Sequence, residues 1–220
     1  MPHPARRVYT PSPMVLADKI RPGFAGQPAV ASSESSAFGA SRATAFTYDL
    51  MLIAAGSAVI ALSAQVAVPL PFSPVPVTGQ TFGVLLVASL LGRARGTAAV
   101  LAYLAEGAAG LPVFAGAAAG PAKLLGPTGG YLAGFALGAY VCGWLAERGW
   151  DRTPLRTTFS MILGNIAIFA LALPWLARFV GASNVWALGF WPFIPGDIVK
   201  IGLAAALLPL GWKALGARGR

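Results

Sequence analysis

The segment from Leu50 to Gly92 reads LMLIAAGSAVIALSAQVAVPLPFSPVPVTGQTFGVLLVASLLG and contains no charged residue. It is about twice as long as the roughly 20 apolar residues that one membrane-spanning helix needs. Prolines from Pro69 to Pro76 divide the segment, and proline does not fit the interior of a regular helix. The segment therefore predicts two spanning helices joined by an extended, proline-rich loop.

The rest of the chain has the same apolar character. Of its 220 residues, 56% are apolar and only 10% are charged, and the mean hydropathy is +0.69. A water-soluble domain of this size still exposes roughly 30% of the surface of its chain. Because so apolar a chain has too few polar groups to cover that surface, we predict an all-α integral membrane protein.

Hydropathy, glycines and prolines divide the chain into a tail, a membrane domain and a second tail. Residues 1–46 are rich in Pro, Ser, Ala and Gly, and we expect them to form a mostly disordered cytoplasmic tail. The membrane domain, 47–213, is expected to contain six transmembrane helices, at about 47–67, 79–92, 96–109, 129–147, 157–179 and 191–213. A short basic tail, 214–220, follows the last helix.

The distribution of charge predicts the orientation of these helices. The chain carries 16 Lys and Arg against 7 Asp and Glu, a net charge of +9. Basic residues gather in the two tails and in the loops around Arg93 and Arg152, whereas the other loops contain only Lys123 and Arg178. By the positive-inside rule, both termini lie in the cytoplasm of a multi-pass protein of the plasma (inner) membrane. Since these residues flank apolar spans and form no stripe, we do not expect nucleic acid binding.

Several classes of chemistry lack the residues that they require. His3 is the only histidine and Cys142 the only cysteine, which excludes an internal disulfide, a cysteine-rich metal site and a Ser-His-Asp triad in the membrane domain. The spans contain no paired carboxylates, and the chain has no Walker A motif. We therefore predict no enzyme activity, no bound metal and no cofactor, and no ATP hydrolysis by this chain.

Asp197 and Lys200 form the sharpest candidate site, because charged groups inside a membrane are costly. They lie in the segment PGDIVK, three residues apart, and therefore on one face of the last helix. The functional interpretation is a substrate site in which Lys200 binds a carboxylate. The alternative is a helix cap with a lysine that reaches the membrane surface, or a structural ion pair.

Three further motifs hold polar groups near predicted helix starts or inside a span. Thr78 and Gln80 lie in PVPVTGQT, Tyr131 follows GPTGG, and Asn165 lies in the uncharged segment LGNI. Each is a candidate for ligand binding, since amide and hydroxyl groups both donate and accept hydrogen bonds. The alternatives are helix capping by Thr78 and a hydrogen bond between helices by Asn165.

Small residues recur along the first predicted helix. Ala54, Ala58 and Ala61 form a smooth ridge on which another helix can pack closely. The ridge predicts either a docking face for a partner protein or a packing face within the bundle.

Taken in order, five motifs resemble those of the BioY family, the biotin-specific S components of energy-coupling-factor (ECF) vitamin transporters. They are PVPVTGQT (74–81), GLPVF (110–114), GPTGGY (126–131), GN (164–165) and PGDIVK (195–200). Each motif alone is short, but five in one order are specific, and the resemblance runs from about residue 47 to residue 213. It implies a six-helix S-component bundle that binds biotin near the outer membrane surface.

The resemblance also implies partners and roles for residues. Uptake would depend on a transmembrane coupling protein, docked at Ala54, Ala58 and Ala61, and on two cytoplasmic ATPases. A homo-oligomer that transports alone is the other option. In the cavity, Lys200 would bind the carboxylate. Polar groups for the ureido ring and apolar groups for the sleeve around the ligand would come from Asp197, Asn165, Gln80, Thr78, Tyr131, Phe82 and Phe114. Alternative functions are an S component for another vitamin, a small membrane enzyme, and a channel.

Overall fold

The computed structural model describes residues 15–20 and 35–217, which form helices and one short hairpin. The helices are α1 (Leu16–Ile20), α2 (Ser35–Gln65), α3 (Gln80–Ala108), α4 (Pro121–Leu125), α5 (Gly129–Ala146), α6 (Pro154–Val180), α7 (Val185–Gly189) and α8 (Ile194–Ala217). Strands β1 (Ala67–Val68) and β2 (Val77–Thr78) pair antiparallel between α2 and α3. The short 3-10 helices η1 (Ala115–Ala117) and η2 (Trp191–Phe193) complete the described part of the chain.

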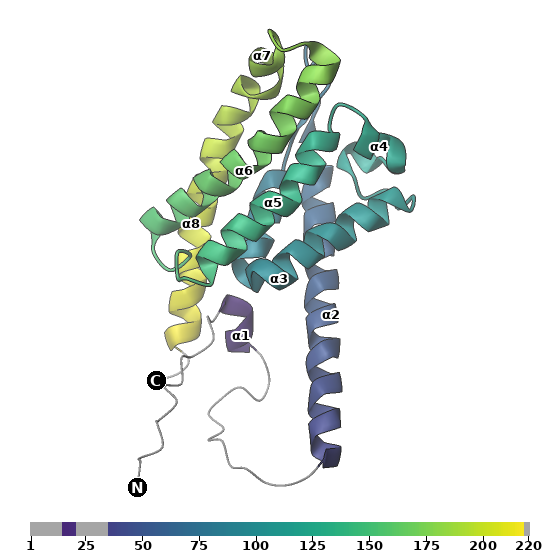
Figure 1. Ribbon diagram of the computed structural model, residues 1–220. Helices are drawn as coiled ribbons and strands as arrows, with labels where there is room; N and C mark the ends of the chain where they lie inside the picture. The colour runs from purple at the N-terminus through teal and green to yellow at the C-terminus, as the bar shows by residue number, and fades with distance from the viewer. Residues whose placement is uncertain (1–14, 21–34, 218–220) are drawn as a thin grey trace, which may run out of the picture.

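The long helices form a bundle around α3 and α5. Helix α3 packs against α2 and α5, α5 packs against α6, and α6 packs against α8 (Figure 1). Within the described ranges, five segments are long and apolar enough to cross a membrane: Thr44–Gln65, Gln80–Ala108, Gly129–Ala146, Pro154–Val180 and Val185–Gly216. The all-helical membrane fold thus agrees with the sequence prediction, while the number of candidate spans is five and not six.

The difference in number arises at Gly92. The sequence predicted separate helices at 79–92 and 96–109, whereas the structure joins both into α3. Gly92 has φ 83° and ψ 175°, a backbone conformation that L side chains rarely adopt, so α3 consists of two helical arms on either side of this residue. The Arg93 backbone N–H just after the break donates to the Glu147 carboxylate, at 3.0 Å, which satisfies a donor that the interrupted helix exposes.

The N-terminal region contains more helix than its composition predicted. Helix α2 begins at Ser35, within the segment expected to be a disordered tail, and α1 packs against α3. Arg95 forms ion pairs with Asp18 of α1, at 2.7 Å, and with Asp49 of α2, at 2.9 Å. Residues 1–14 and 21–34 of the expected N-terminal tail lie outside the described residues, as do 218–220 of the predicted tail 214–220, whose first four residues belong to α8.

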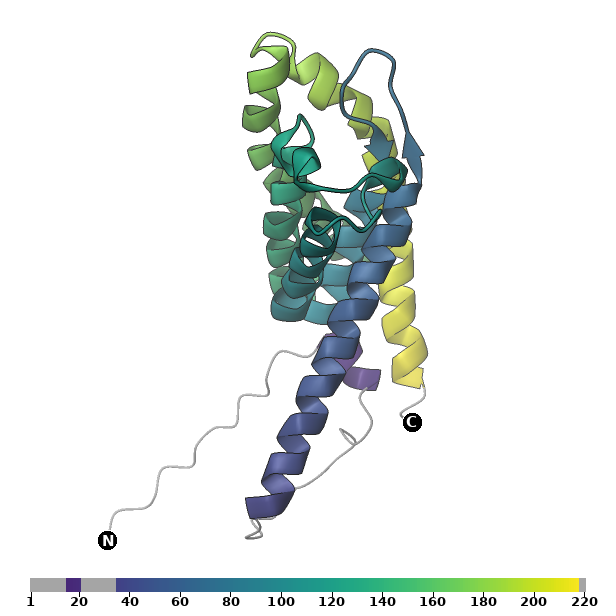
Figure 2. The same cartoon turned by 90° about the vertical axis from the view of Figure 1, so that its right-hand side faces the viewer.

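The two ends of the bundle differ in structure. The hairpin, α4 and α7 gather at one end, which we call the cavity end (Figure 2). Helix α1 and the turn between α5 and α6 lie at the opposite end (Figure 1). The break at Gly92 is there too, since a Cβ on Gly92 would lie 3.0 Å from Glu147 Oε1 and 3.1 Å from Val15 Cγ1. The arginines at 93, 95, 148 and 152 belong to these last segments, so the opposite end is rich in arginine, although Arg93 and Arg95 pair with acidic residues there.

Helices α5 and α6 approach each other closely along a glycine. A Cβ atom added to Gly134 would lie 2.6 Å from the carbonyl oxygen of Ile168 and 3.0 Å from its Cα. Such contact distances are below those of ordinary van der Waals packing, so only glycine fits at this position. Close packing of small residues is a main source of helix association in membranes, because lipid competes with apolar side chains.

Asp151 provides a prediction about stability at the opposite end. It lies outside the membrane-spanning segments, is 2% exposed, and accepts a hydrogen bond from the Trp212 indole N–H. Burial raises the pKa of Asp151 above its ordinary value, although the hydrogen bond from Trp212 opposes this shift. The folded state therefore binds this proton more tightly than the unfolded state does, and the free energy of unfolding falls as pH rises through the raised pKa.

The substitution Asp151→Asn keeps an oxygen for Trp212 and removes the buried charge. We expect the variant to melt at a higher temperature than the wild type at pH 7, and the difference to shrink as the pH is lowered and the wild-type carboxyl takes up its proton. Thermal unfolding in detergent across this range measures the effect. Parallel melting profiles for the two proteins would contradict it.

Candidate functional site: a cavity with a buried ion pair

A cavity of about 770 Å³, including the part open to solvent, lies at the cavity end between α3, α5, α6, α8 and the hairpin. Most of its wall is apolar and comes from Pro74, Val75, Pro76, Phe114, Ala115, Leu132, Phe135, Ile168, Phe169 and Phe193. The polar side chains that interrupt this wall determine what the cavity can bind.

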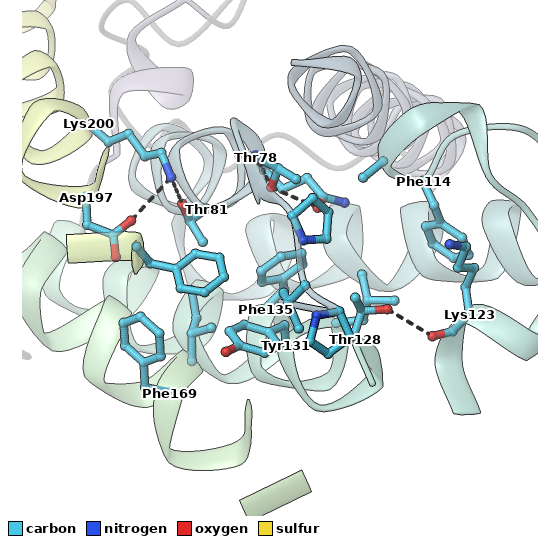
Figure 3. Close-up of a pocket in the computed structure, with 18 residues that line it drawn as sticks. Thr78, Thr81, Phe114, Lys123, Thr128, Tyr131, Phe135, Phe169, Asp197 and Lys200 are labelled. Carbon is cyan, nitrogen blue, oxygen red and sulfur yellow. Dashed lines mark hydrogen bonds and ion pairs between the residues drawn. The ribbon is translucent and has the colours of Figure 1, made fainter. Parts of the chain in front are cut away.

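Asp197 and Lys200 lie together on the wall that α8 contributes (Figure 3). The Lys200 Nζ is 3.2 Å from Asp197 Oδ1 and donates a hydrogen bond to Thr81 Oγ1 at 2.8 Å. The side chains are 16% and 6% exposed, so each charge depends on the other for compensation. Within the described residues, Asp197 Oδ2 is buried and has no hydrogen-bond partner. One acceptor atom is therefore left for a ligand.

Thr78 and Gln80 form a hydrogen-bond network with Tyr103 at the start of α3. The Thr78 hydroxyl donates to Gln80 Oε1 at 3.0 Å, and the Gln80 amide donates to the Tyr103 hydroxyl. The Gln80 backbone N–H, at the start of α3, also donates to Thr78 Oγ1 at 3.3 Å. Both Thr78 and Gln80 line the cavity, but their side chains already bind one another. They therefore present a fixed polar wall.

Aromatic rings form the side of the cavity next to α6 and η2. The Tyr131 hydroxyl donates to the carbonyl oxygen of Gly189, which fixes the ring against α7. Phe193 lies 5.7 Å and Phe169 6.2 Å from Tyr131, measured between ring centroids. Phe114 lies on another part of the wall, edge-on to Tyr103 at 5.5 Å. These rings offer flat apolar surfaces to a ligand whose ends are polar.

Asn165 and Phe82 lie outside this cavity. Both line a smaller cavity of about 180 Å³ that shares Thr81 and Lys200 with the main one. Asn165 is 8% exposed, and its Oδ1 has no partner among the described residues. The structure thus brings six of the predicted site residues to the main cavity, namely Lys200, Asp197, Gln80, Thr78, Tyr131 and Phe114. Asn165 and Phe82 line only the smaller cavity, which adjoins the main cavity at Thr81 and Lys200.

The structure adds functional residues that the motifs did not select. Thr81 positions the Lys200 ammonium group, and its place within the motif PVPVTGQT was a signal for this role. Lys123 of α4 also lines the cavity, and it is the only charged residue between Glu106 and Glu147. Phe169 and Phe193 are cavity residues that nothing in the local sequence separates from ordinary apolar residues.

The predicted docking alanines lie on the outer surface of α2. Ala54 and Ala58 are exposed, and Ala61 is partly buried. In the same turns of α2, Gly56 and Ser57 are the residues that are buried. Packing within the bundle therefore leaves Ala54 and Ala58 exposed on the surface of α2.

Candidate membrane spans and a largely apolar cavity with one buried ion pair define a membrane protein that holds a small polar molecule. The comparison with protein families agrees with this class. The model of the BioY family matches residues 33–217. The chain belongs to the BioY family.

Relatives in the family match most of this chain. It is 42% identical over 167 residues to the biotin transporter BioY of Thermotoga maritima, covering 74% of this chain and 96% of that protein. It is 38% identical over 184 residues to the biotin transporter BioY of Rhizobium etli, covering 78% and 98%. Among solved structures, the crystal structure at 2.1 Å of the S-component for biotin from an ECF-type ABC transporter matches with a TM-score of 0.68 and 26% identity, covering 77% of this chain and 93% of the other.

Proposed function

We propose that this protein binds biotin in the main cavity and acts in biotin uptake as the S component of an ECF transporter. The observation that carries the proposal is the Asp197–Lys200 pair at the wall of an apolar cavity. Family membership and the similarity to a biotin S component support the same ligand.

The chemistry of biotin fits the groups that the cavity offers. Its ureido ring has two N–H donors and one carbonyl acceptor, and its fused rings and aliphatic tail are apolar. The unpartnered Asp197 Oδ2 can accept from a ureido N–H, and the third N–H of Lys200 can donate to the ureido oxygen. The ring wall of Tyr131 and Phe169 suits the apolar part.

The proposed topology has six spans with both termini in the cytoplasm. Because α3 consists of two arms joined at Gly92, each arm would count as one span, which adds a sixth to the five candidate segments. The basic residues at the opposite end support a cytoplasmic position for that end. The cavity would then open toward the outer surface of the plasma membrane, where the vitamin arrives.

We propose that α2 docks on the transmembrane coupling protein, with two cytoplasmic ATPases supplying energy. The exposed alanines Ala54 and Ala58 support this, since small residues let another helix approach closely. In this arrangement the ATPases, and not this chain, would hydrolyse ATP. A homo-oligomer that works without these partners is the second option.

Another vitamin is the main alternative ligand. A cationic vitamin such as thiamine would be bound best by carboxylates, and Asp197 is the one carboxylate among the described residues that line the cavity. Lys200 compensates that carboxylate already. The compensated Asp197–Lys200 pair thus favours a neutral ligand group over a cation.

Mass spectrometry of the ligand that copurifies with the protein tests the proposal. We expect biotin to be released on denaturation of protein from biotin-fed cells, and ligand-free protein to bind biotin but not thiamine or nicotinate in calorimetric titrations. Binding of thiamine or nicotinate without binding of biotin would contradict the proposed function.

A further inference from the structure

A groove on the outer surface of the bundle, between α4, α5 and α6, is separate from the main cavity. Its volume is about 430 Å³, including the part open to the surroundings, and it is lined by Leu124, Gly129, Gly130, Ala133, Leu171 and Trp175. We propose that this groove binds one acyl chain of a phospholipid and that Arg178 holds the phosphate group of the same lipid. The site goes beyond the proposed function and does not depend on it.

Helix α5 separates the groove from the main cavity. Its residues Tyr131 and Phe135 line the cavity, whereas the groove is lined by residues with little or no side chain, at positions 129, 130 and 133. Ala133 and Leu171 are exposed, so the groove opens to the side of the bundle. Because α5 and α6 are both candidate membrane spans, the molecules on this side are lipids.

The lining of the groove favours hydrocarbon over water. Its side chains are apolar except for the indole of Trp175, whose N–H already donates to the carbonyl oxygen of Gly126 at 2.9 Å. A bound water needs about two to four polar partners, which these side chains do not offer. A flexible acyl chain instead gives the lining atoms the dispersion contacts that close packing provides elsewhere in a protein.

Arg178 provides a cation beside the groove. It lies in the last turn of α6, and its guanidinium carbon is 5.2 Å from the centroid of the Trp175 ring. The side chain is exposed, and among the ion pairs of the described residues none includes it. A guanidinium group binds phosphate through two parallel hydrogen bonds, and tryptophan is enriched at the depth of lipid headgroups. An apolar groove with a free cation beside it thus complements a lipid that carries both an acyl chain and a phosphate.

Quenching of Trp175 fluorescence by brominated lipids tests the site. Each protein is titrated in detergent with a lipid that carries bromine on its acyl chains. The signal of Trp175 is the difference between that protein and its Trp175→Phe counterpart. Two lipids with identical chains are compared, phosphatidylglycerol and diacylglycerol, of which the second has no phosphate. We expect the wild type to bind phosphatidylglycerol more tightly than diacylglycerol.

Two substitutions distinguish binding of the acyl chain from binding of the phosphate. Ala133→Leu fills the groove with a side chain, so we expect it to weaken the binding of both lipids at least tenfold. Arg178→Gln removes the cation and should weaken phosphatidylglycerol binding about fivefold, the effect of one basic residue beside an anionic lipid. Its affinity for diacylglycerol should stay within twofold of the wild type.

Ala206→Leu and Arg156→Gln are the matched controls. Ala206 is an exposed alanine on α8, and Arg156 is an exposed cation near the other end of α6. Neither residue lines the groove. Both variants should therefore show the same quenching of Trp175 as the wild type with either lipid.

Three outcomes would overturn the site. Equal quenching in the wild type and in Ala133→Leu would show that no acyl chain enters the groove. An equal loss of phosphatidylglycerol affinity in Arg178→Gln and Arg156→Gln would rule out a direct contact with Arg178. A dimer in light scattering that Ala133→Leu converts to a monomer, without quenching of Trp175 by lipid, would assign the groove to a second copy of the chain. Biotin enters none of these measurements, so a failure of the proposed function would leave their outcome unchanged.

Discussion

Lys200→Ala is expected to weaken biotin binding at least thirtyfold, about 2 kcal/mol. The substitution removes a donor to the ligand and leaves the Asp197 carboxylate, 6% exposed, without its counter-ion. Removal of one partner of a buried ion pair costs more free energy than the intact pair contributes, because the remaining charge stays desolvated. Calorimetric titration of the purified variant measures the change, and unchanged affinity would rule out the assignment of this pair to the site.

Asp197→Asn combined with Lys200→Gln separates binding from folding. The double variant has no buried charge, so we expect it to accumulate and melt close to the wild type even if Lys200→Ala does not. Its biotin affinity should still fall at least tenfold, about 1.4 kcal/mol, since amide groups replace charge-assisted hydrogen bonds with weaker ones. Wild-type affinity in the double variant would show that the charges serve structure alone.

Gly134→Leu is expected to have the largest effect on stability, lowering the free energy of unfolding by about 3 kcal/mol, at the upper part of the range for overfilled cores. The Cβ of the new side chain would already lie 2.6 Å from the Ile168 carbonyl oxygen. This oxygen belongs to the backbone of α6, which cannot rotate away as a side chain can. Helix α6 would have to move outward. Ile168 and Phe169 line the cavity, so biotin affinity should fall together with the melting temperature.

Gly202→Leu is the control for that substitution. A Cβ at Gly202 on α8 would meet no heavy atom within 4 Å. Leucine also has a higher helix propensity than glycine, so this variant should melt at or above the wild-type temperature. Equal melting temperatures for wild type and Gly134→Leu would contradict the close contact between α5 and α6.

Local sequence predicted the last three long helices well. The predicted ranges 129–147, 157–179 and 191–213 correspond to α5, α6 and α8. Each is a long apolar run with charged or glycine-rich ends, and such ends leave few alternative positions for the start and end of a helix. The position of α1 was not predictable in this way, because it depends on tertiary contacts such as that of Arg95 with Asp18, which lie far apart in sequence.

The site was predictable to a similar, limited extent. Asp197 and Lys200 stood out because charge inside an apolar span is costly, and the structure places them together at the cavity. Whether Asn165 reaches the main cavity depends on the rotation of α6 about its axis and on the cavity's floor at Thr81, which no local pattern determines. Lys123 was counted as a loop charge, since the turn of chain that brings α4 over the cavity is a tertiary feature.

The broken helix α3 has a consequence for how the protein enters the bilayer. An arm of 80–91 rises about 18 Å and an arm of 93–108 about 24 Å. Both are shorter than the roughly 30 Å hydrocarbon layer, so under the proposed topology neither arm is a stable span by itself. Under that topology the lipid around the two arms would have to thin to match their length. The thickness of the host membrane therefore becomes a determinant of assembly.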